Sequence, residues 1–560
     1  MPSSPFGSLY CHQQPGWAPL SLPCLSFLRY YQGFLSQLDF LQVVVMRHLM
    51  RELSANCEVL PVEVKCRKRQ AWTSTPCRCK EIQMHIISYR GPGMGGGVSP
   101  SLSRLEASAN GNSSWWFLSA DGEVCARFGG HKEEKIGQLS KEIVDGHYRY
   151  CNEFLWPIMH DLSEYATYSQ EHRISYEKFN RILARKISRY TSAINFFVQD
   201  YQLALMPLQL KRLCNADTAV FWHIPWPKSV PEQFLEPIID LTKSMLSAQY
   251  VGFHTTEYAE NFLNFVEQHI PGFKTFPDQL TITRETAKTY MPYIHPFFEG
   301  KIEVYPAKSR GQTQVVVAPL GLDVAYWQNL AADRSQANPL SGLLKTDYIL
   351  SVDRADYTKG VIPRLKSIAH FFDFHPELKG KITFAQICGK SRMNIEAFAK
   401  YYWETRSLVN SVNAQHGTDD WQPVVDVPGP LNSAELAALY RDASVMLVNP
   451  VRDGLNLTAK EFVACQSANP GSLALSPNAG VFDELGPWSV KVNPQSPIEM
   501  SASIYHALMM PEEDRSACVR RMNNRLHANP LNLWVDTFTE LLAEPESTNY
   551  VNSLPLSAAR

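Results

Sequence analysis

Short apolar runs alternate with amphipathic stretches along the chain from about residue 84 onward. The runs have the length of buried strands, and the stretches between them carry apolar residues at helical spacing. Strands are predicted at His85–Ser88, Ile194–Val198, Ala219–His223, Tyr250–Phe253, Gln314–Ala318, Tyr348–Val352, Ile382–Ile387, Pro423–Val427 and Val445–Asn449. Helices are predicted at Lys178–Arg189, Pro231–Leu246, Tyr258–Gln268 and Ala434–Asp442. This alternation predicts an α/β fold in which helices cover both faces of parallel sheets.

The pattern also changes along the chain, and these changes divide it into candidate parts. Residues 1–83 are rich in Pro, Ser and Cys and show no sustained period, so we expect the working protein to begin near Met84; a functional N-terminal arm is the alternative. The polar stretch Leu330–Lys345 separates two α/β halves. After Met510, a helical pattern places Trp534, Phe538 and Leu541 on one face, which suits a helix that returns to the first half. The predicted parts are 1–83, an atypical and poorly ordered extension; 84–335, a first α/β domain; 336–510, a second; 511–545, the returning helical segment; and 546–560, a tail.

The composition fits a globular chain with no general attraction for polyanions. Of the 560 residues, 45% are hydrophobic and 19% are charged, and the formal net charge is −2. No long-range field therefore recruits nucleic acid or an acidic membrane. No apolar run reaches the roughly 18 residues that span a bilayer, and no clear signal-peptide pattern is present. We expect a cytoplasmic protein that binds small molecules, with no nucleic-acid or membrane partner; homo-oligomer formation is left open.

Motifs for a metal or for a covalent nucleophile are missing from the sequence. Cys77 and Cys79 lack the spacer and the second ligand pair of a zinc site. There is no His-Glu-x-x-His, Gly-x-Ser-x-Gly or Walker motif, and no Asp-x-Asp follows a predicted strand. We therefore expect no metal and no cofactor, and we expect Arg and Lys side chains to stabilise a bound anion instead.

Polar residues that directly follow strands are the first candidates, because doubly wound sheets bind ligands at the carboxyl ends of their strands. The segment Arg452–Glu461 follows a strand and enters a helix. We expect Gly454 to permit an unusual backbone conformation, so that the amides of residues 455–457 face an anion at the helix start. Asp453 and Glu461 would then accept hydrogen bonds from sugar and ribose hydroxyls. The alternative is an ordinary helix that Asp453 caps.

Two further segments supply cations at the same predicted edge. Arg354 and Lys359, in the segment Ser351–Gly360, can converge on a diphosphate, with a planar fork and a point charge respectively. The alternative is a pair of solvated cations, one of them paired with Asp356. Arg392 follows another strand, where it suits an acceptor phosphate or is an ordinary surface residue.

Three more segments have both a functional and a structural interpretation. Asp200 either orients a hydroxyl of an acceptor or caps a turn, and His223 either contacts a ligand or is a hydrogen-bonded core residue. The Gly-rich segment Tyr89–Gly97 either brings backbone amides to an anion or is a flexible connector. Sugar stacking and core packing are both open, with core packing favoured, for Trp115, Trp116 and Trp156.

Together and in this order, four segments resemble the trehalose-6-phosphate synthase family of retaining glycosyltransferases: VQDYQLALMP, HIPWP, SVDRADYTKG and NPVRDGLNLTAKEFVACQ. The resemblance extends from about Met84 to about residue 545. It implies the GT-B arrangement, in which two Rossmann-like domains face each other across a cleft and a C-terminal helix crosses back. It also implies that the chain transfers glucose from UDP-glucose, or from another nucleotide-glucose, to glucose-6-phosphate. The implied reaction needs no metal and forms no covalent enzyme intermediate. It would be a step of trehalose biosynthesis and serve osmoprotection.

The resemblance also assigns roles to individual residues. The catalytic groups that it implies are Asp200, His223, Arg354, Lys359 and Asp453. The donor contacts that it implies are Gly96, Arg354, Lys359, Asp453, Asn456, Leu457 and Glu461. The acceptor contacts that it implies are Arg90, Tyr148 (or His147), Trp156, Asp200, Tyr201 and Arg392.

Three departures from the family pattern fall on the acceptor side or near it. They are the sequence HYRYCNEFLWP around Tyr148, Trp226 where Phe is more usual, and the short loop between Arg90 and Gly96. They leave open a glucosylglycerol-phosphate synthase that uses ADP-glucose and glycerol-3-phosphate, although Arg392 favours a hexose phosphate. The motif DYTKG argues against a relative that joins cyclitols.

A catalytically silent sugar-phosphate sensor is the alternative of another class. Such a relative would be marked by loss of Arg354, Lys359 or Glu461, and the chain has all three. The sequence therefore favours an enzyme over a sensor.

Overall fold

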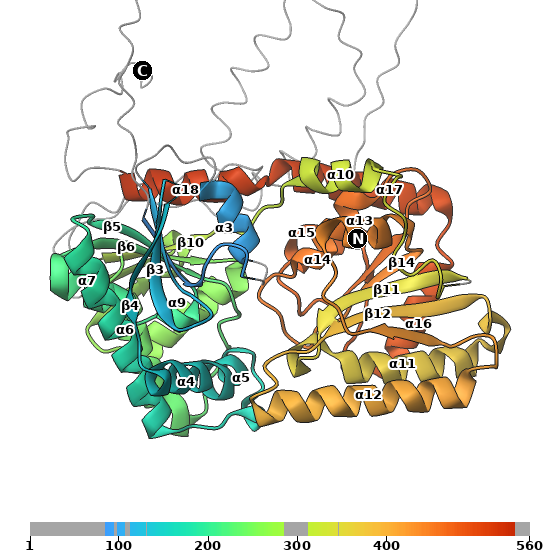
Figure 1. Cartoon of the computed structure of the whole chain (residues 1–560), viewed down its shortest axis with the longest axis horizontal. Coiled ribbons are helices and arrows are strands. Elements are labelled where there is room, and N and C mark those ends of the chain that lie inside the picture. Colours follow the sequence, from blue (N-terminus) through green and yellow to red (C-terminus); the bar gives the residue numbers. More distant parts are fainter. Residues whose placement is uncertain are drawn as a thin grey trace, which may run out of the picture. The chain divides into compact units, whose positions relative to one another are not determined.

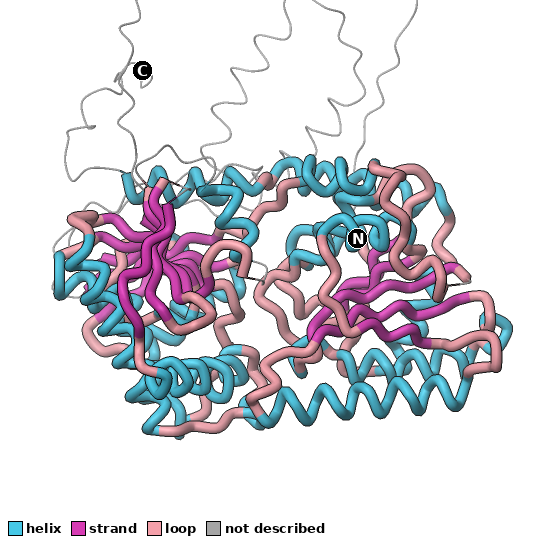
Figure 2. Tube along the Cα trace, in the orientation of Figure 1, coloured by secondary structure: helices cyan, strands magenta, loops and turns pink. Residues whose placement is uncertain are grey.

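The computed structural model describes residues 85–94, 98–106, 113–129, 132–284, 312–344 and 346–543. These residues form two α/β domains, each built on its own sheet (Figure 2). The predictions for residues 1–83, Gly96 and residues 546–560 lie outside the described residues.

The first domain contains a ten-stranded sheet in the order β4-β3-β2-β1-β5-β6-β7-β10-β9-β8. Its strands are β1 (His85–Arg90), β2 (Ser114–Leu118), β3 (Glu123–Phe128), β4 (Lys132–Gln138), β5 (Asn195–Gln199), β6 (Asp217–Trp222), β7 (Tyr250–Phe253), β8 (Phe273–Phe276), β9 (Thr281–Arg284) and β10 (Gln312–Val317). The six strands from β2 to β10 pair in parallel. The outer pairs on both sides are antiparallel.

The first sheet carries antiparallel edge strands in addition to the predicted parallel strands. β4 has the sequence KEEKIGQ and is mostly exposed, so it lacks the apolar run on which the strand predictions depended. Charged residues on an exposed edge strand also discourage pairing with another chain. β3 is half-buried at its ends and carries Glu123 and Arg127, which hides it from a search for continuous apolar runs in the same way.

The second domain contains a six-stranded parallel sheet in the order β13-β12-β11-β14-β15-β16. Its strands are β11 (Asp347–Arg354), β12 (Ile382–Gly389), β13 (Val424–Val427), β14 (Val445–Val448), β15 (Ser472–Leu475) and β16 (Val490–Lys491). This is the doubly wound order 3-2-1-4-5-6, which confirms the predicted fold class here. In such sheets the ligand lies where the chain reverses direction across the sheet, which here is between the ends of β11 and β14.

Helices cover both sheets. Those of the first domain are α3 (Val98–Glu106), α4 (Lys141–Arg149), α5 (Trp156–Met159), α6 (Gln170–Tyr190), α7 (Met206–Cys214), α8 (Leu235–Met245), α9 (Thr256–His269) and, at the end of the chain, α18 (Leu531–Ala543). Those of the second are α10 (Val324–Ala332), α11 (Val361–Phe374), α12 (Glu396–His416), α13 (Ser433–Asp442), α14 (Leu457–Cys465), α15 (Phe482–Leu485), α16 (Pro497–Leu508) and α17 (Glu512–Ala528). None of the described helices has the length and apolarity that a membrane span needs.

The chain passes between the two domains twice, at residues 318–323 and at residues 529–531, and these two crossings lie side by side. The Leu531 N–H donates to the Leu322 carbonyl at 3.3 Å. Gly321 leaves no room for a side chain, because a Cβ there would lie 2.4 Å from the Pro530 carbonyl oxygen. The two crossings are therefore packed backbone against backbone.

After the second crossing, α18 lies across the first domain (Figure 1). Its Phe538 ring stacks on Phe197 with centroids 4.6 Å apart, and its Trp534 ring meets Phe221 edge-on at 4.9 Å. Both rings of α18 are buried. The apolar face of this helix thus closes the core on one side of β5 and β6.

Candidate active site

A cleft of about 570 Å³ lies at the carboxyl ends of strands from both sheets. β1, β5 and β6 lead into it from the first domain, and β11 and β14 lead into it from the second. Every predicted site residue within the described part of the chain lines this cleft: Arg90, Tyr148, Trp156, Asp200, Tyr201, His223, Arg354, Lys359, Arg392, Asp453, Asn456, Leu457 and Glu461. Gly96 lies outside the described residues.

An ion pair joins the two segments that follow β11 and β14. The Lys359 ammonium donates to Asp453 Oδ2 at 2.5 Å, and the Asn456 side-chain amide donates to the same oxygen at 3.0 Å. Burial alone would raise the pKa of Asp453, but the Lys359 charge and these two hydrogen bonds lower it below its ordinary value. Asp453 is therefore a carboxylate whose position is fixed in the cleft.

Arg354 stands beside this pair at the end of β11. No hydrogen bond or ion pair with a described residue engages its guanidinium. Burial lowers the pKa of Arg354 from its ordinary value, and the neighbouring charges of Arg392 and Arg90 lower it further. The charge of Asp356 acts in the opposite direction. A guanidinium placed next to other cations, and not paired within the described chain, favours the binding of an anion.

The first turn of α14 points another set of donors at the cleft. Asn456 is the N-cap of this helix, with φ +84°, and its side-chain oxygen accepts from the Ala459 N–H at 3.3 Å. The first N–H groups of a helix have no partner within the helix, so they are available to an anion. Asp453, proposed as the alternative cap, does not cap the helix.

The expectation that Gly454 adopts an unusual backbone conformation is wrong. Its φ is not positive; the positive value belongs to Asn456. What Gly454 provides is a close approach between the domains, because a Cβ there would lie 2.0 Å from the His223 carbonyl oxygen. The absent side chain lets the loop after β14 touch the end of β6.

Arg392 is fixed from two sides. Its guanidinium donates to Asp356 Oδ2 at 2.7 Å and lies 4.0 Å from the centroid of the Trp156 ring. Asp356 is fully buried, and it also accepts from the N–H and hydroxyl of Thr358. The alternative in which Asp356 pairs with Arg354 or Lys359 is wrong, since the partner is Arg392.

Asp200 ends β5 in a backbone conformation that is rare for its residue type, with φ +71°. β1 and β5 are the strands between which the first sheet reverses direction, so Asp200 lies at the switch point of that sheet. Its Oδ1 accepts from the His223 N–H at 3.1 Å. Burial raises its pKa to about 7, although the Tyr201 and His223 amides and Arg392 act in the opposite direction.

The two candidates for the aromatic acceptor contact differ in burial. The His147 ring is fully buried, is stacked on Phe179 with centroids 3.8 Å apart, and is within 2.9 Å of the Gln202 carbonyl through Nε2. Tyr148 is partly exposed at the cleft. The stacking and the carbonyl contact hold the His147 ring in the core, which leaves Tyr148 as the more accessible of the two.

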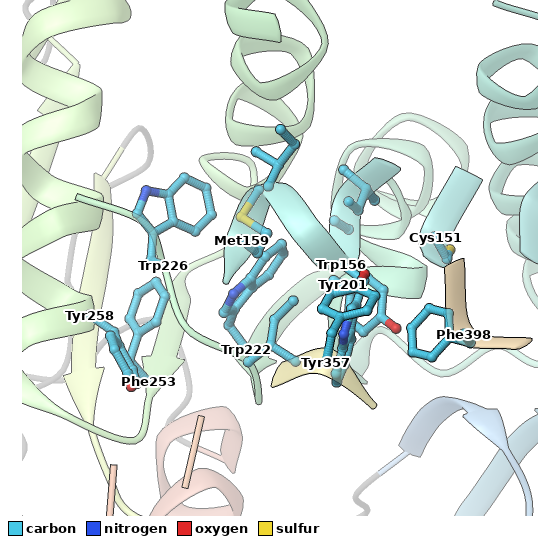
Figure 3. Packing of buried hydrophobic residues seen from close by; sticks show 14 of the residues in the cluster. Cys151, Trp156, Met159, Tyr201, Trp222, Trp226, Phe253, Tyr258, Tyr357 and Phe398 are labelled. Atoms are coloured by element: carbon cyan, nitrogen blue, oxygen red, sulfur yellow. The ribbon is translucent and has the colours of Figure 1, made fainter. Parts of the chain in front are cut away.

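The tryptophans separate into core and cleft. Trp115, Trp116 and Trp226 are fully buried, and none of them lines the cleft. Figure 3 shows Trp226 beside Phe253, apart from Trp156, Tyr201 and Tyr357. Trp226 was expected near the acceptor; it packs instead against the rings of Phe253, Phe262 and Phe265. This departure from the family pattern therefore concerns the core.

Some residues that shape the site were not predicted. His254 follows β7 at the same sheet edge and Gln199 ends β5, and both contact His223. The positions of His254 and Gln199 after strands are a signal that could have found them. The buried Arg364, which donates to Asp353 and Asn449 beneath the cleft, lies in a helix and gives no such signal.

No group of three or more His, Cys, Asp or Glu side chains in the described ranges is arranged to hold a metal ion. Operation without a metal or cofactor stays a prediction.

Comparison with known proteins shows that the chain is similar to glycosyltransferases. The model of glycosyltransferase family 20 matches residues 131–544. The UDP-forming α,α-trehalose-phosphate synthase of Pichia angusta is 30% identical over 417 residues, which cover 72% of this chain and 82% of that protein. The bifunctional trehalose-6-phosphate synthase/phosphatase of Thermoproteus tenax is 30% identical over 417 residues, but the chain spans only 53% of its length.

A solved structure from E. coli, described as trehalose-6-phosphate bound with UDP-2-fluoro glucose, has the same fold. The TM-score is 0.72 at 25% identity, and the match covers 83% of this chain and 99% of that one. This agreement over nearly the whole of that chain confirms the predicted GT-B arrangement.

The raised pKa of Asp200 makes a testable prediction about stability. A carboxyl whose pKa is 3.8 when exposed and about 7 in the fold binds more protons when folded, so its ionisation costs stability as the pH rises from about 4 to about 7. Asp200→Asn removes this cost. Its melting temperature should exceed that of the wild type at pH 8, by about 2–4 °C per kcal/mol relieved, and the difference should vanish near pH 4.

Thermal unfolding at a series of pH values measures this difference. Asp347→Asn is the matched control, because Asp347 is an exposed carboxylate at the start of β11. An Asp200→Asn advantage that is equal at pH 4 and pH 8 would contradict the assignment.

Proposed function

This chain belongs to glycosyltransferase family 20, and from that membership we propose that it transfers glucose from a nucleotide-glucose, with UDP-glucose favoured, to glucose-6-phosphate, forming trehalose 6-phosphate with retention of configuration. The single observation that carries the proposal is that Arg354, Lys359, Asp453 and the start of α14 line one cleft. That set of groups suits a sugar diphosphate.

The donor diphosphate would lie against the cations of the second domain. Arg354 offers a planar fork, Lys359 a point charge, and the first amides of α14 the positive end of a helix dipole. Asp453, fixed by Lys359 and Asn456, would accept hydrogen bonds from glucose hydroxyls. Glu461 lies further along α14, where its carboxylate already accepts from the Tyr440 hydroxyl at 3.0 Å, and it suits the ribose.

The acceptor would lie toward the first domain. Arg90, Arg392 and Tyr148 line that part of the cleft and suit a phosphate, while Trp156 and Tyr201 supply aromatic surface. Arg392 is held by Asp356 and Trp156, so it needs little reorganisation to bind an anion. Asp200, at the switch point of the first sheet, would orient the attacking hydroxyl.

In the proposed reaction, the bond between the anomeric carbon and the diphosphate oxygen breaks as the acceptor oxygen forms its bond on the same face. The acceptor proton passes to the leaving phosphate oxygen. Negative charge grows on the diphosphate, where Arg354, Lys359 and the α14 amides stabilise it without reorganisation. Charge stabilisation of this kind requires neither a covalent intermediate nor a metal.

The alternatives receive less support. Both curated relatives described above are named as trehalose-phosphate synthases, which favours glucose-6-phosphate over glycerol-3-phosphate as the acceptor. A silent sensor is not favoured, because Arg354, Lys359 and Glu461 are present and line one cleft. Cytoplasmic location and a role in osmoprotection stay predictions.

Arg354→Ala should lower kcat by about 10²–10³, the scale for loss of one preorganised electrostatic donor. Arg354→Lys should recover part of this loss, since it restores the charge without the fork. Arg441→Ala is the control, because Arg441 is engaged by Asp442 and does not line the cleft. Steady-state kinetics measures all three; a folded Arg354→Ala protein within about threefold of the wild type would contradict the role.

Substrate identity is tested by a matrix of UDP-, ADP- and GDP-glucose against glucose-6-phosphate and glycerol-3-phosphate. Released nucleotide is measured with and without EDTA. We expect turnover to be highest with UDP-glucose and glucose-6-phosphate and to be unchanged by EDTA. Preference for ADP-glucose and glycerol-3-phosphate would favour the alternative synthase, and no turnover with any pair would favour the sensor.

A further inference from the structure

A chain of hydrogen bonds runs from the crossing between the domains into the cleft. It begins at Lys460, which is fully buried and donates to the Leu320 carbonyl at 2.8 Å. The same ammonium lies 2.5 Å from Glu484, whose other carboxylate oxygen accepts from Asn529 at 3.0 Å. Since Leu320 lies on the first crossing and Asn529 on the second, this buried pair holds both.

The next contact is made by the backbone N–H of the same residue, Leu320. The Leu320 N–H donates to His254 Nδ1 at 3.3 Å, and His254 Nε2 lies 3.2 Å from His223 Nδ1. His223 Nε2 then lies 2.9 Å from Gln199 Oε1. His223, His254 and Gln199 are buried, and all three line the cleft together with Leu320.

The Leu320 N–H sets the direction of the hydrogen bonds from His254 to Gln199, although the Ala318 backbone also contacts His254. A backbone N–H can only donate, so His254 Nδ1 accepts and the proton of His254 lies on Nε2. His223 Nδ1 must then accept, and its own proton lies on Nε2, which donates to the amide oxygen of Gln199. Burial lowers the pKa of His223 to about 3. Burial lowers the pKa of His254 well below its ordinary value; any charge on His223 and the Lys460 ammonium act in the same direction, and a backbone contact with Ala318 opposes them. Both rings are therefore neutral near pH 7.

The chain ends on a donor inside the site. Gln199 turns its oxygen to His223, and its Nε2 is buried without a hydrogen-bond partner among the described residues. His223 also gives its backbone N–H to Asp200, on the acceptor side. If the proton of His223 moved from Nε2 to Nδ1, Nε2 would become an acceptor. The Gln199 amide would then rotate to donate to it, and an oxygen would lie where the site now has an N–H.

We propose that His254 is a positioning residue for glucose transfer. Hydrogen bonds link it on one side to the domain crossing, which Lys460 holds, and on the other side to His223 and Gln199. His254 thereby fixes which hydrogen-bond donors face the sugar. This inference rests on the proposed function for its kinetic consequence. The hydrogen-bond order itself does not depend on the substrate.

Two conservative variants separate the roles of the two nitrogens of His254. His254→Gln places an amide N–H near the position of Nε2, so it can still donate to His223. His254→Asn places an oxygen near the position of Nδ1, so it satisfies the Leu320 N–H but does not reach His223. We expect kcat of the Gln variant to stay within about threefold of the wild type and that of the Asn variant to fall by about 10–100-fold, the scale for a misplaced reacting group.

The control is His416→Asn. His416 is a buried histidine of α12 that does not line the cleft, so its replacement reports the general cost of Asn in place of a buried His. We expect this variant to keep wild-type kcat. Equal losses in the Gln and Asn variants of His254, or no loss beyond threefold in either, would overturn the proposal.

Nitrogen NMR of protein labelled in histidine gives a readout that needs no turnover. We expect unprotonated Nδ1 and protonated Nε2 in both His254 and His223 of the wild type, with the His223 signals identified by their loss in His223→Asn. The Gln variant should keep this state of His223, and the Asn variant should change it. A wild-type His223 protonated on Nδ1 overturns the proposal even if the enzyme is active; absence of turnover in the wild type, with the expected signals, overturns the proposed function instead.

Discussion

The contact between Lys359 and Asp453 is the interaction on which the rest of the site depends. It joins the loop after β11 to the loop after β14, the two strands between which the second sheet reverses direction. Burial alone would raise the pKa of Asp453, and the Lys359 charge keeps it below its ordinary value. The position of this pair sets the start of α14 through Asn456. The carboxylate, the ammonium and the helix amides therefore share one rigid frame, and Arg354 lies beside it.

A second constraint is that the two domains touch around this frame. Arg392 of the second domain lies on Trp156 of the first, Tyr357 stacks on Tyr165 with centroids 4.2 Å apart, and the Tyr258 hydroxyl donates to the Asp453 carbonyl at 2.8 Å. On the opposite side, the crossings of the chain are packed backbone against backbone. The cleft is thus bounded by contacts that depend on both domains, which is why residues far apart in sequence face one another in it.

The sequence predicted those features that depend on continuous apolar runs. Each predicted strand corresponds to a strand of the structure, because a buried parallel strand must be apolar along its whole length. The same reasoning missed β3 and β4, whose exposed positions are polar, and it also missed the fully buried β2 and β15 and the short strands β8, β9 and β16. It assigned Gly454 the wrong role. The reason for a glycine there is a contact with the His223 carbonyl in the other domain. The residues after strands were correctly gathered at one cleft, but the partner of Asp356 and the core position of Trp226 depend on packing that no local pattern records.

A crystal structure of the protein with bound UDP tests the central claim most directly. The account predicts the diphosphate between Arg354 and Lys359, with its oxygens facing the first amides of α14 and the ribose near Glu461. A nucleotide bound elsewhere, or one bound in the cleft with its phosphates turned away from Arg354 and Lys359, would contradict it.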